Sequence, residues 1–150
     1  MSADLLQPTR TAAEVRVGDR LEGLSIPVTP TFVVSTALAT RDFQDVHHDR
    51  DLAQSRGSKD IFLNILTSTG LVQRYVTDWA GPQALVREVS VRLGAPCYPY
   101  STLELTGAVT EVATDGADRA QHIVKVTGTT DIGDHVVATV RVELPAEEAR

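Results

Sequence analysis

The chain has 150 residues, 42% of them hydrophobic and 23% charged, which suits one globular domain and is too short for two. Its net charge of −6 and pI near 5.1, with no offsetting basic stripe, argue against a surface for nucleic acid or anionic membranes. Cys97 is the only cysteine, which excludes a disulfide framework and a cysteine-based metal site.

The sequence predicts a single domain between two tails. Residues 1–13 are polar, with one proline, and predict a flexible N-terminal tail. Residues 14–145 form the domain, and the charged residues 146–150 predict a frayed C-terminal tail. The N-terminus lacks the charged-then-apolar pattern of a signal peptide, and no apolar run reaches membrane-spanning length. We therefore expect a soluble, cytoplasmic protein.

The first part of the domain shows several short patterns. Residues 14–21 alternate apolar and polar side chains and predict a short edge segment, whereas the β-branched residues 31–37 predict a strand. Residues 42–49 have no clear period, so we expect a loop or a single helical turn there. Residues 49–57 predict a short helix that Asp49 caps and Gly57 ends.

The longest predicted helix covers residues 61–79. Asp60 is its candidate N-cap, and Gly81 followed by Pro82 ends it. Apolar side chains cover much of its circumference, so we expect the helix to be buried on most sides.

Four short alternating segments follow the helix, and turn residues separate them. They are residues 86–93, 102–112, 121–130 and 135–144. Consecutive strands without intervening helices predict an antiparallel sheet. The expected fold class is therefore α+β, with an antiparallel sheet of five to six strands wrapped around one long central helix, which is the hotdog arrangement. His122 and His135 fall within these strands and are expected to be ordinary sheet residues.

Three segments carry a resemblance to a known family. Residues 42–47 (DFQDVH) resemble the Asp-x-Asn-Pro-Ile/Leu-His motif of the MaoC-like, (R)-specific enoyl-CoA hydratases. Residues 70–82 resemble the central helix of that family and its exit, and residues 92–99 resemble its Arg-Phe-x-x-Pro-Val-x-Pro strand and bend. The resemblance extends over residues 31–142. It implies a hotdog fold and hydration of an enoyl-CoA thioester, with coenzyme A as part of the substrate, no separate cofactor and no metal.

One branch of the family is more similar still. Residues 35–51, and residues 64–67 together with 70–82, resemble the small subunits of actinobacterial steroid side-chain hydratases, which act in cholesterol catabolism. This resemblance implies a substrate with an enoyl-CoA thioester on the steroid D ring. It also implies a heteromer with a second MaoC-like hotdog protein that lacks the catalytic pair and makes room for the rings.

Hydration of an enoyl thioester has three chemical needs: water loses a proton, the α carbon gains one, and charge on the thioester oxygen is stabilised. By resemblance, Asp42 and His47 are the catalytic pair that holds the water. Which of them protonates the α carbon stays open. Backbone N–H groups at the start of the long helix are candidates for the third need, and the helix dipole would assist them.

The chain departs from the family pattern at two points. Gln44-Asp45 replaces Asn-Pro, and Leu63-Asn64 replaces a His-Gly pair whose glycine N–H contacts the thioester oxygen. We still expect oxyanion or substrate contacts from residues at these helix-start positions, namely Leu63, Asn64 and Ile65. Candidate contacts to the phosphates of coenzyme A are Arg74, Arg87 and Arg92.

Other functions compete with this interpretation. His47-x-Asp49, with His122 or His135, matches the ligand types of a 2-His-1-carboxylate iron site. A hotdog thioesterase would use a carboxylate near the central helix, for which Asp60 and Asp78 are the candidates. The remaining alternatives are a general homodimeric (R)-specific hydratase for linear acyl-CoA and a non-catalytic subunit that binds acyl-CoA.

Overall fold

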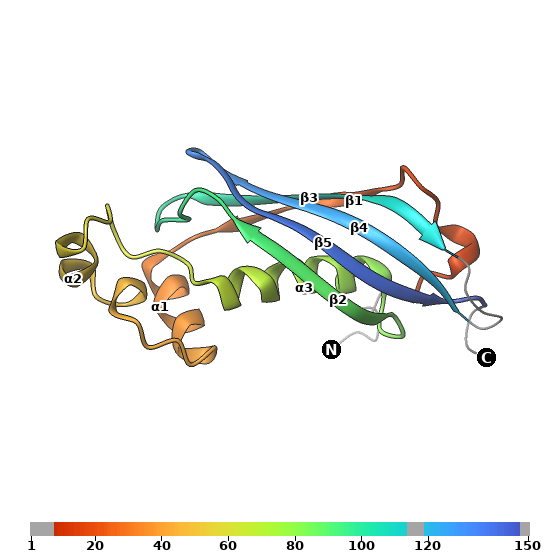
Figure 1. Cartoon of the computed structure of the whole chain (residues 1–150), viewed down its shortest axis with the longest axis horizontal. Helices are drawn as coiled ribbons and strands as arrows, with labels where there is room; N and C mark the ends of the chain where they lie inside the picture. The colour runs from red at the N-terminus through yellow and green to blue at the C-terminus, as the bar shows by residue number, and fades with distance from the viewer. Residues whose placement is uncertain (1–7, 114–118, 148–150) are drawn as a thin grey trace.

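One antiparallel sheet of five strands forms the body of the protein (Figure 1). The computed structural model describes residues 8–113 and 119–147. The strand order is β1-β3-β4-β5-β2. The strands are β1 (Arg20–Pro27), β2 (Leu85–Leu93), β3 (Thr102–Ala113), β4 (Arg119–Thr130) and β5 (Gly133–Pro145). The four strands predicted after the long helix are confirmed.

The buried face of the sheet follows from alternation along the strands. In β4, every second residue from Ala120 to Gly128 is buried, and Val124 pairs with Val140 of β5. Leu103 and Leu105 of β3 are fully buried in the same core. Because neighbouring side chains point to opposite faces of a strand, one face collects the apolar set and can cover a helix.

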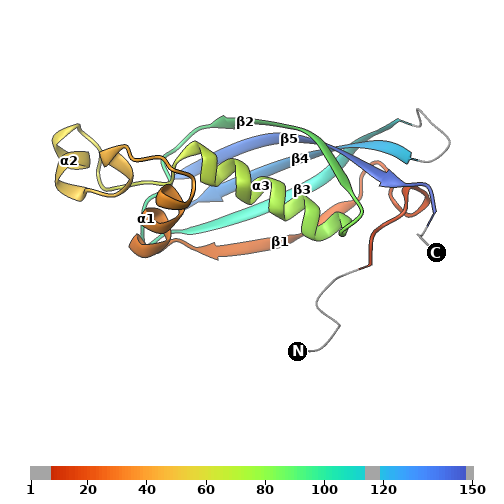
Figure 2. The same cartoon turned by 90° about the horizontal axis from the view of Figure 1, so that it is seen from below.

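That helix is α3 (Ile65–Ala80), which lies across the sheet between β1 and β2 (Figure 2). Its buried side chains are Thr67, Ser68, Val72, Tyr75, Val76 and Ala80. The prediction that the helix is buried on most sides is wrong, because only this one face is buried and Ile65 and Leu66 are half exposed. The hydroxyl of Tyr75 donates to the carbonyl of Glu22 at 2.8 Å and ties α3 to β1.

The start of α3 differs from the prediction. The helix begins at Ile65 and is capped by Asn64, not by Asp60. The backbone N–H of Leu63 donates to the carbonyl of Cys97 at 3.0 Å, which holds the preceding residues outside the helix. Asp60 instead accepts two hydrogen bonds from the guanidinium of Arg50.

The predicted strand at residues 31–37 is wrong. This segment lies in α1 (Pro30–Ala39), whose N-cap Thr29 accepts a hydrogen bond from the N–H of Phe32 at 3.0 Å. Pro30 occupies the first turn, where its missing N–H does no harm. The capping signal therefore outweighs the β-branched composition of the segment.

The segment before β1 also differs from the prediction. Residues 14–21 do not form one extended edge, because Ala12–Glu14 is a short 3-10 helix (η2) and β1 begins only at Arg20. Arg10 donates its backbone N–H to the carbonyl of Ala80 at 2.9 Å, so residues near it contact the end of α3. Residues 1–7 of the predicted N-terminal tail and 148–150 of the C-terminal tail lie outside the described residues.

Residues 28–64 form what we call the β1–α3 segment. It contains α1, the 3-10 turn η3 (Asp45–His47) and α2 (Arg50–Ser55), which confirms the predicted turn and the short helix. These elements gather at one end of the sheet, beside the first turn of α3 (Figures 1 and 2). Among the helices of the described residues, none is long and apolar enough to cross a membrane.

Candidate active site

Asp42 is placed by the C-terminus of α1. The N–H of Asp42 donates to the carbonyl of Ala37 at 2.9 Å, and the N–H of Arg41 donates to that of Leu38 at 3.0 Å. These two bonds form a Schellman motif. Arg41 occupies its left-handed position with φ 58°, a conformation that costs a non-glycine residue about 1–2 kcal/mol. The end of α1 therefore fixes the backbone position of Asp42, at the cost of some strain at Arg41.

His47 is held by hydrogen bonds to its backbone and to its ring. Its N–H donates to the carbonyl of Gln44 at 3.1 Å, and its ring Nδ1 lies 2.7 Å from the carbonyl oxygen of Phe62. Since a carbonyl oxygen only accepts, Nδ1 carries the proton and Nε2 of the neutral ring keeps a lone pair. The ring of Phe62 packs against the imidazole with its centroid 5.0 Å away. Both the tautomer and the ring orientation are thereby set.

Asp42 and His47 face each other across a short gap. Nε2 of His47 lies 3.5 Å from Oδ2 of Asp42, longer than an ordinary hydrogen bond. Both atoms are acceptors when the imidazole is neutral and the carboxyl is ionised, so a water molecule that donates to each satisfies both. The side chain of Asp42 is 18% exposed, which leaves the pair accessible to solvent and substrate. This geometry can bind and polarise one water.

Asn64 joins Asp42 to α3. Its Oδ1 accepts the backbone N–H of Thr67 at 3.0 Å, and its Nδ2 donates to Oδ2 of Asp42 at 3.0 Å and to Oγ1 of Thr40 at 2.8 Å. Because a backbone N–H can only donate, the bond to Thr67 fixes which end of the amide is oxygen. The N-cap of α3 is thus also a ligand of the candidate catalytic carboxylate.

These contacts keep Asp42 ionised. The hydrogen bond from the Asn64 amide is the largest cause that lowers the pKa of Asp42 below its usual value. Burial acts in the opposite direction, while the N–H of Gln44 and the nearby His47 lower the pKa further. Asp42 is therefore a carboxylate at neutral pH, although the amide that holds it carries no charge.

The first turn of α3 offers backbone donors beside this pair. Within the described part of the chain, the N–H groups of Asn64, Ile65 and Leu66 have no hydrogen-bond acceptor. Such groups are left over at every helix N-terminus and attract negative charge together with the helix dipole. They are candidates to bind an oxygen on which negative charge develops.

The other predicted site residues lie in different environments. Leu63 is 1% exposed and belongs to the core, whereas Ile65 is half exposed at the start of α3. Arg74 forms an ion pair with Asp78, and Arg87 forms one with Glu143. Arg92 is exposed on β2 and has no ion-pair partner among the described residues. The structure thus brings Asp42, His47 and Asn64 together, and it places the arginines on α3 and β2.

Two supporting residues were missed by sequence reasoning. Oγ1 of Thr40 donates to the carbonyl of Thr36 at 2.8 Å and accepts from Asn64, so it forms part of the same network. The carbonyl of Phe62 fixes the tautomer of His47. The position of Thr40 at the end of a helix could have pointed to this role. The prediction of a strand at residues 31–37 hid that helix end. A backbone carbonyl such as that of Phe62 leaves no mark in the side-chain sequence.

The residues of the alternative sites are engaged elsewhere. The carboxylate of Asp49 caps α2 by accepting the N–H of Leu52 at 3.0 Å, and Nε2 of the buried His135 meets Oγ of Ser68 at 2.8 Å. In residues 8–113 and 119–147, no three His, Cys, Asp or Glu side chains form a metal-binding group. The two thioesterase candidates are also paired with arginine, Asp60 with Arg50 and Asp78 with Arg74.

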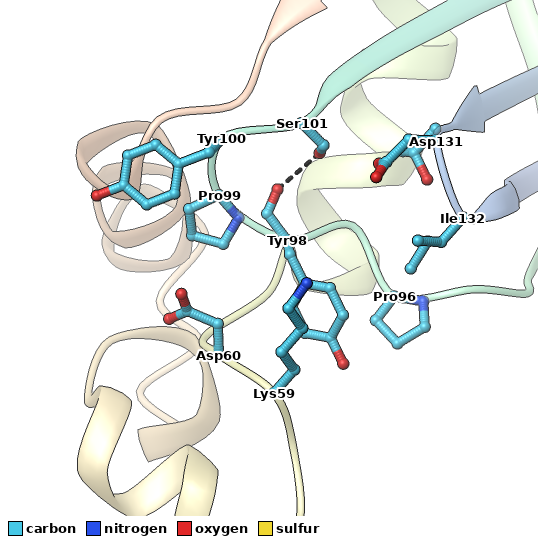
Figure 3. A pocket seen from close by; sticks show the side chains of 10 residues that line it. Lys59, Asp60, Pro96, Tyr98, Pro99, Tyr100, Ser101, Asp131 and Ile132 are labelled. Carbon is cyan, nitrogen blue, oxygen red and sulfur yellow. Dashed lines mark hydrogen bonds between the residues drawn. The ribbon is translucent and has the colours of Figure 1, made fainter.

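A surface cavity of about 220 Å³ lies among Lys59, Tyr98 and Asp131 (Figure 3). Figure 3 shows Lys59 running beside the ring of Tyr98, with Asp60 and Ile132 on different sides of the hollow. Phe62 contacts the rings of both His47 and Tyr98, with centroid distances of 5.0 and 6.5 Å. The lining of this cavity includes neither Asp42 nor His47. Asp42 and His47 therefore do not lie in this cavity.

Comparison with protein families gives one match over most of the chain. The model of the MaoC like domain matches residues 12–140. The 3-oxo-4,17-pregnadiene-20-carboxyl-CoA hydratase beta subunit of Mycobacterium tuberculosis is 59% identical over 128 residues, which are 85% of this chain and 95% of that protein.

Solved structures agree with the fold. A chain in the crystal structure of the ChsH1-ChsH2 complex from M. tuberculosis is 58% identical, with a TM-score of 0.81; the match covers 86% of this chain and 98% of that one. The (R)-hydratase from A. caviae involved in PHA biosynthesis matches with a TM-score of 0.75 at 18% identity, over 87% of this chain and 98% of that one, which shows the fold alone. The predicted α+β hotdog fold is confirmed.

Proposed function

Because the chain belongs to the MaoC-like domain family, we propose that it is the catalytic subunit of a hydratase for a steroid-linked enoyl-CoA thioester. The reaction adds water across the α,β double bond during degradation of the cholesterol side chain. The observation that carries the proposal is the gap of 3.5 Å between Nε2 of His47 and Oδ2 of Asp42, in a chain so similar to a steroid carboxyl-CoA hydratase subunit.

Asp42 and His47 supply the proton chemistry. One water donates hydrogen bonds to the Asp42 carboxylate and to the Nε2 lone pair of His47. Its oxygen bonds to the β carbon as one of its O–H bonds breaks, and the released proton passes to the pair. The pair returns a proton to the α carbon, so one water is added and the protein ends in its starting protonation state. Nδ1 of His47 keeps its proton on the carbonyl of Phe62 throughout.

The first turn of α3 stabilises the charge on the thioester oxygen. Attack at the β carbon moves electron density onto that oxygen, and the N–H groups of Asn64 and Ile65 are the donors that we assign to it. Asn64 supplies its backbone N–H for this role, while its side chain is already bound to Asp42, Thr40 and Thr67. The family's glycine is thus replaced by a residue whose side chain is already bound within the protein.

Binding of the substrate needs more than this chain. Large apolar side chains next to the site residues are exposed, namely Leu38, Phe43, Ile65 and Leu66. An exposed apolar patch beside a polar site suits a partner or a bulky ring system. We propose a heteromer with a second MaoC-like hotdog protein that makes room for the steroid. Arg74, Arg87 and Arg92 stay candidates for contacts to the phosphates of coenzyme A, which belongs to the substrate. The cytoplasmic location stays a prediction.

The test is hydration of a steroid-linked enoyl-CoA and of a short linear enoyl-CoA, by this chain alone and together with its second MaoC-like protein. We expect the mixture to hydrate the steroid thioester and this chain alone to be slow with it. Full activity of the chain alone on the linear substrate would support a general homodimeric (R)-specific hydratase instead. Binding of both thioesters without turnover in any mixture would support a non-catalytic acyl-CoA-binding subunit.

A further inference from the structure

The side chain of Asn64 links two parts of the site that come from different elements. Asp42 follows the end of α1, whereas the backbone donors lie in the first turn of α3. The amide bridges them, because it donates to Oδ2 of Asp42 at 3.0 Å and accepts from the N–H of Thr67 at 3.0 Å. Any motion of the Asp42 carboxylate relative to α3 stretches one of these bonds.

The amide has little freedom to take another arrangement. Asn64 is 3% exposed, and its second Nδ2 hydrogen bond, to Oγ1 of Thr40 at 2.8 Å, blocks rotation toward solvent. Thr40 in turn donates to the carbonyl of Thr36 at 2.8 Å, so the network is anchored in α1. A buried amide with both ends satisfied is rigid, since any rotation leaves a polar atom unpaired.

We propose that Asn64 is a positioning residue that holds the Asp42 carboxylate, as an anion, at a fixed place against the first turn of α3. This role goes beyond capping the helix, and it rests on the proposed function only in treating Asp42 as part of the catalytic pair. Asn64 acts through Asp42, because its own side chain is fully engaged and does not meet the reacting atoms.

Few charged groups complicate a test by titration. His47, from η3, is the titratable group that faces Asp42, and the Gln44 N–H approaches the other carboxylate oxygen at 3.3 Å. From α1 the facing side chain is Thr40 and from α3 it is Asn64, and neither of these titrates. A change at residue 64 therefore reaches Asp42 mainly through the lost amide bond.

The key variant is Asn64→Ser. Serine is a good N-cap and can still accept the N–H of Thr67, but it is too short and has no amide to donate to Asp42. We expect the pKa of Asp42 to rise by about one unit, because a hydrogen bond to a charged group is lost. Turnover should fall as well, with kcat about tenfold lower, because the carboxylate is less well placed. Carbon-13 NMR titration of the Asp42 carboxyl measures the pKa without any need for turnover.

Two further variants separate positioning from capping. Asn64→Asp keeps a strong cap but places a second carboxylate beside Asp42, so we expect a larger upward shift than in the serine variant. Thr29→Ala removes the N-cap of α1 and should lower Tm without moving the carboxyl titration of Asp42. All variants are compared in the full chain together with its second MaoC-like protein.

The outcomes are distinct. An Asn64→Ser protein that loses thermal stability but keeps the wild-type carboxyl titration of Asp42 would show that Asn64 is only a helix cap, and would overturn the proposal. If the wild-type protein hydrates no enoyl-CoA, the proposed function fails. The carboxyl titration would then still decide whether Asn64 holds Asp42.

Discussion

Two buried histidines near the first turn of α3 are bound in nearly the same way. Nδ1 of His47, in the β1–α3 segment, lies 2.7 Å from the carbonyl of Phe62, and Nδ1 of His135, in the sheet, lies 2.8 Å from that of Ala95. Both rings therefore leave the lone pair on Nε2. Around His135 that lone pair meets the hydroxyl of Ser68 at 2.8 Å, whereas around His47 it faces a carboxylate at 3.5 Å.

The difference separates a candidate catalytic histidine from a structural one. A fixed tautomer is common to both regions and thus does not by itself indicate catalysis. His135 is saturated and 1% exposed, so it can neither take up a proton easily nor meet a substrate. Nε2 of His47 and Oδ2 of Asp42 are both acceptors. A bridging donor such as water is needed to give each of them a hydrogen bond. Substitutions around His47 should therefore lower turnover, whereas substitutions around His135 should lower stability.

The largest effect is expected from the pair in the β1–α3 segment. Asp42→Asn removes the carboxylate and His47→Ala removes the imidazole, and each should lower kcat by about 10² or more, as loss of a positioned acid or base does. Steady-state hydration of the enoyl-CoA measures this. His48→Gln is the matched control, because His48 is exposed and its ring Nε2 lies 3.2 Å from the carbonyl of Phe43, outside the Asp42 network. It should keep wild-type turnover.

A different result would change the roles. If His47→Ala raised only KM and left kcat intact, the imidazole would hold the substrate and not the water. The free lone pair of His47 would then not explain why it differs from His135.

The second effect is on stability, in the region of His135. Ser68→Ala leaves Nε2 of His135 without its donor inside the core, which should lower the free energy of unfolding by about 1–3 kcal/mol. Turnover of the folded protein should fall less than tenfold. Urea unfolding and kcat are measured on the same samples. Thr69→Ala, the neighbouring hydroxyl that bonds the helix carbonyl of Ile65, is the control and should change stability little.

Buried histidines also predict a dependence of stability on pH. Burial lowers the pKa of His135 and of His122, so both are neutral in the folded protein. In the unfolded chain each takes up a proton near pH 6.5, so the unfolded state binds more protons below that pH. The free energy of unfolding should be highest above pH 6.5 and should fall on acidification, by up to about 1.4 kcal/mol per pH unit for each histidine.

His122 offers a way to isolate this contribution. Its Nε2 is buried without a hydrogen-bond partner in the described structure, so His122→Leu removes both a titrating group and an unpaired atom. The variant should be at least as stable as the wild type at pH 7.5 and should lose less stability at pH 5. Urea unfolding at both pH values tests this, and an unchanged slope would mean that His122 is already protonated or solvated in the folded state.

How far the sequence predicts the molecule also differs between the two regions. The strands that surround His135 alternate regularly, because one face of an antiparallel sheet covers α3, and that alternation predicted their bounds to within a few residues. The β1–α3 segment has no such period. The β-branched composition of α1 predicts a strand, whereas the cap from Thr29 and the proline that follows it favour the helix that is observed.

The candidate site was predictable only in part for the same reason. The motif predicted that Asp42 and His47 belong together, and Asn64 was expected near the oxyanion position. The amide bond from Asn64 to Asp42 was not predictable, because it depends on how the end of α1 meets the start of α3. Contacts between elements that are far apart in the sequence are set by packing, on which a single sequence carries little information.

Backbone strain is the smallest difference between the two regions. Two residues before His135, the positive φ of 127° falls on Gly133, whereas next to Asp42 the positive φ of 58° falls on Arg41. Arg41→Gly should therefore raise the free energy of unfolding by about 0.5–1 kcal/mol, since relief of strain exceeds the added entropy of the unfolded chain. Turnover should stay within twofold, and urea unfolding measures the gain.

Gly133→Ala is the reverse experiment and completes the comparison. Among the described residues beyond its two chain neighbours, no atom lies within 4 Å of the position that the new Cβ would take. Any loss of stability therefore comes from the backbone conformation and not from a clash. We expect a loss of about 1 kcal/mol. If Arg41→Gly instead lowered stability while Gly133→Ala behaved as expected, the side chain of Arg41 would contribute contacts that outweigh its strain. The end of α1 would then be held by that side chain as well as by its two Schellman hydrogen bonds.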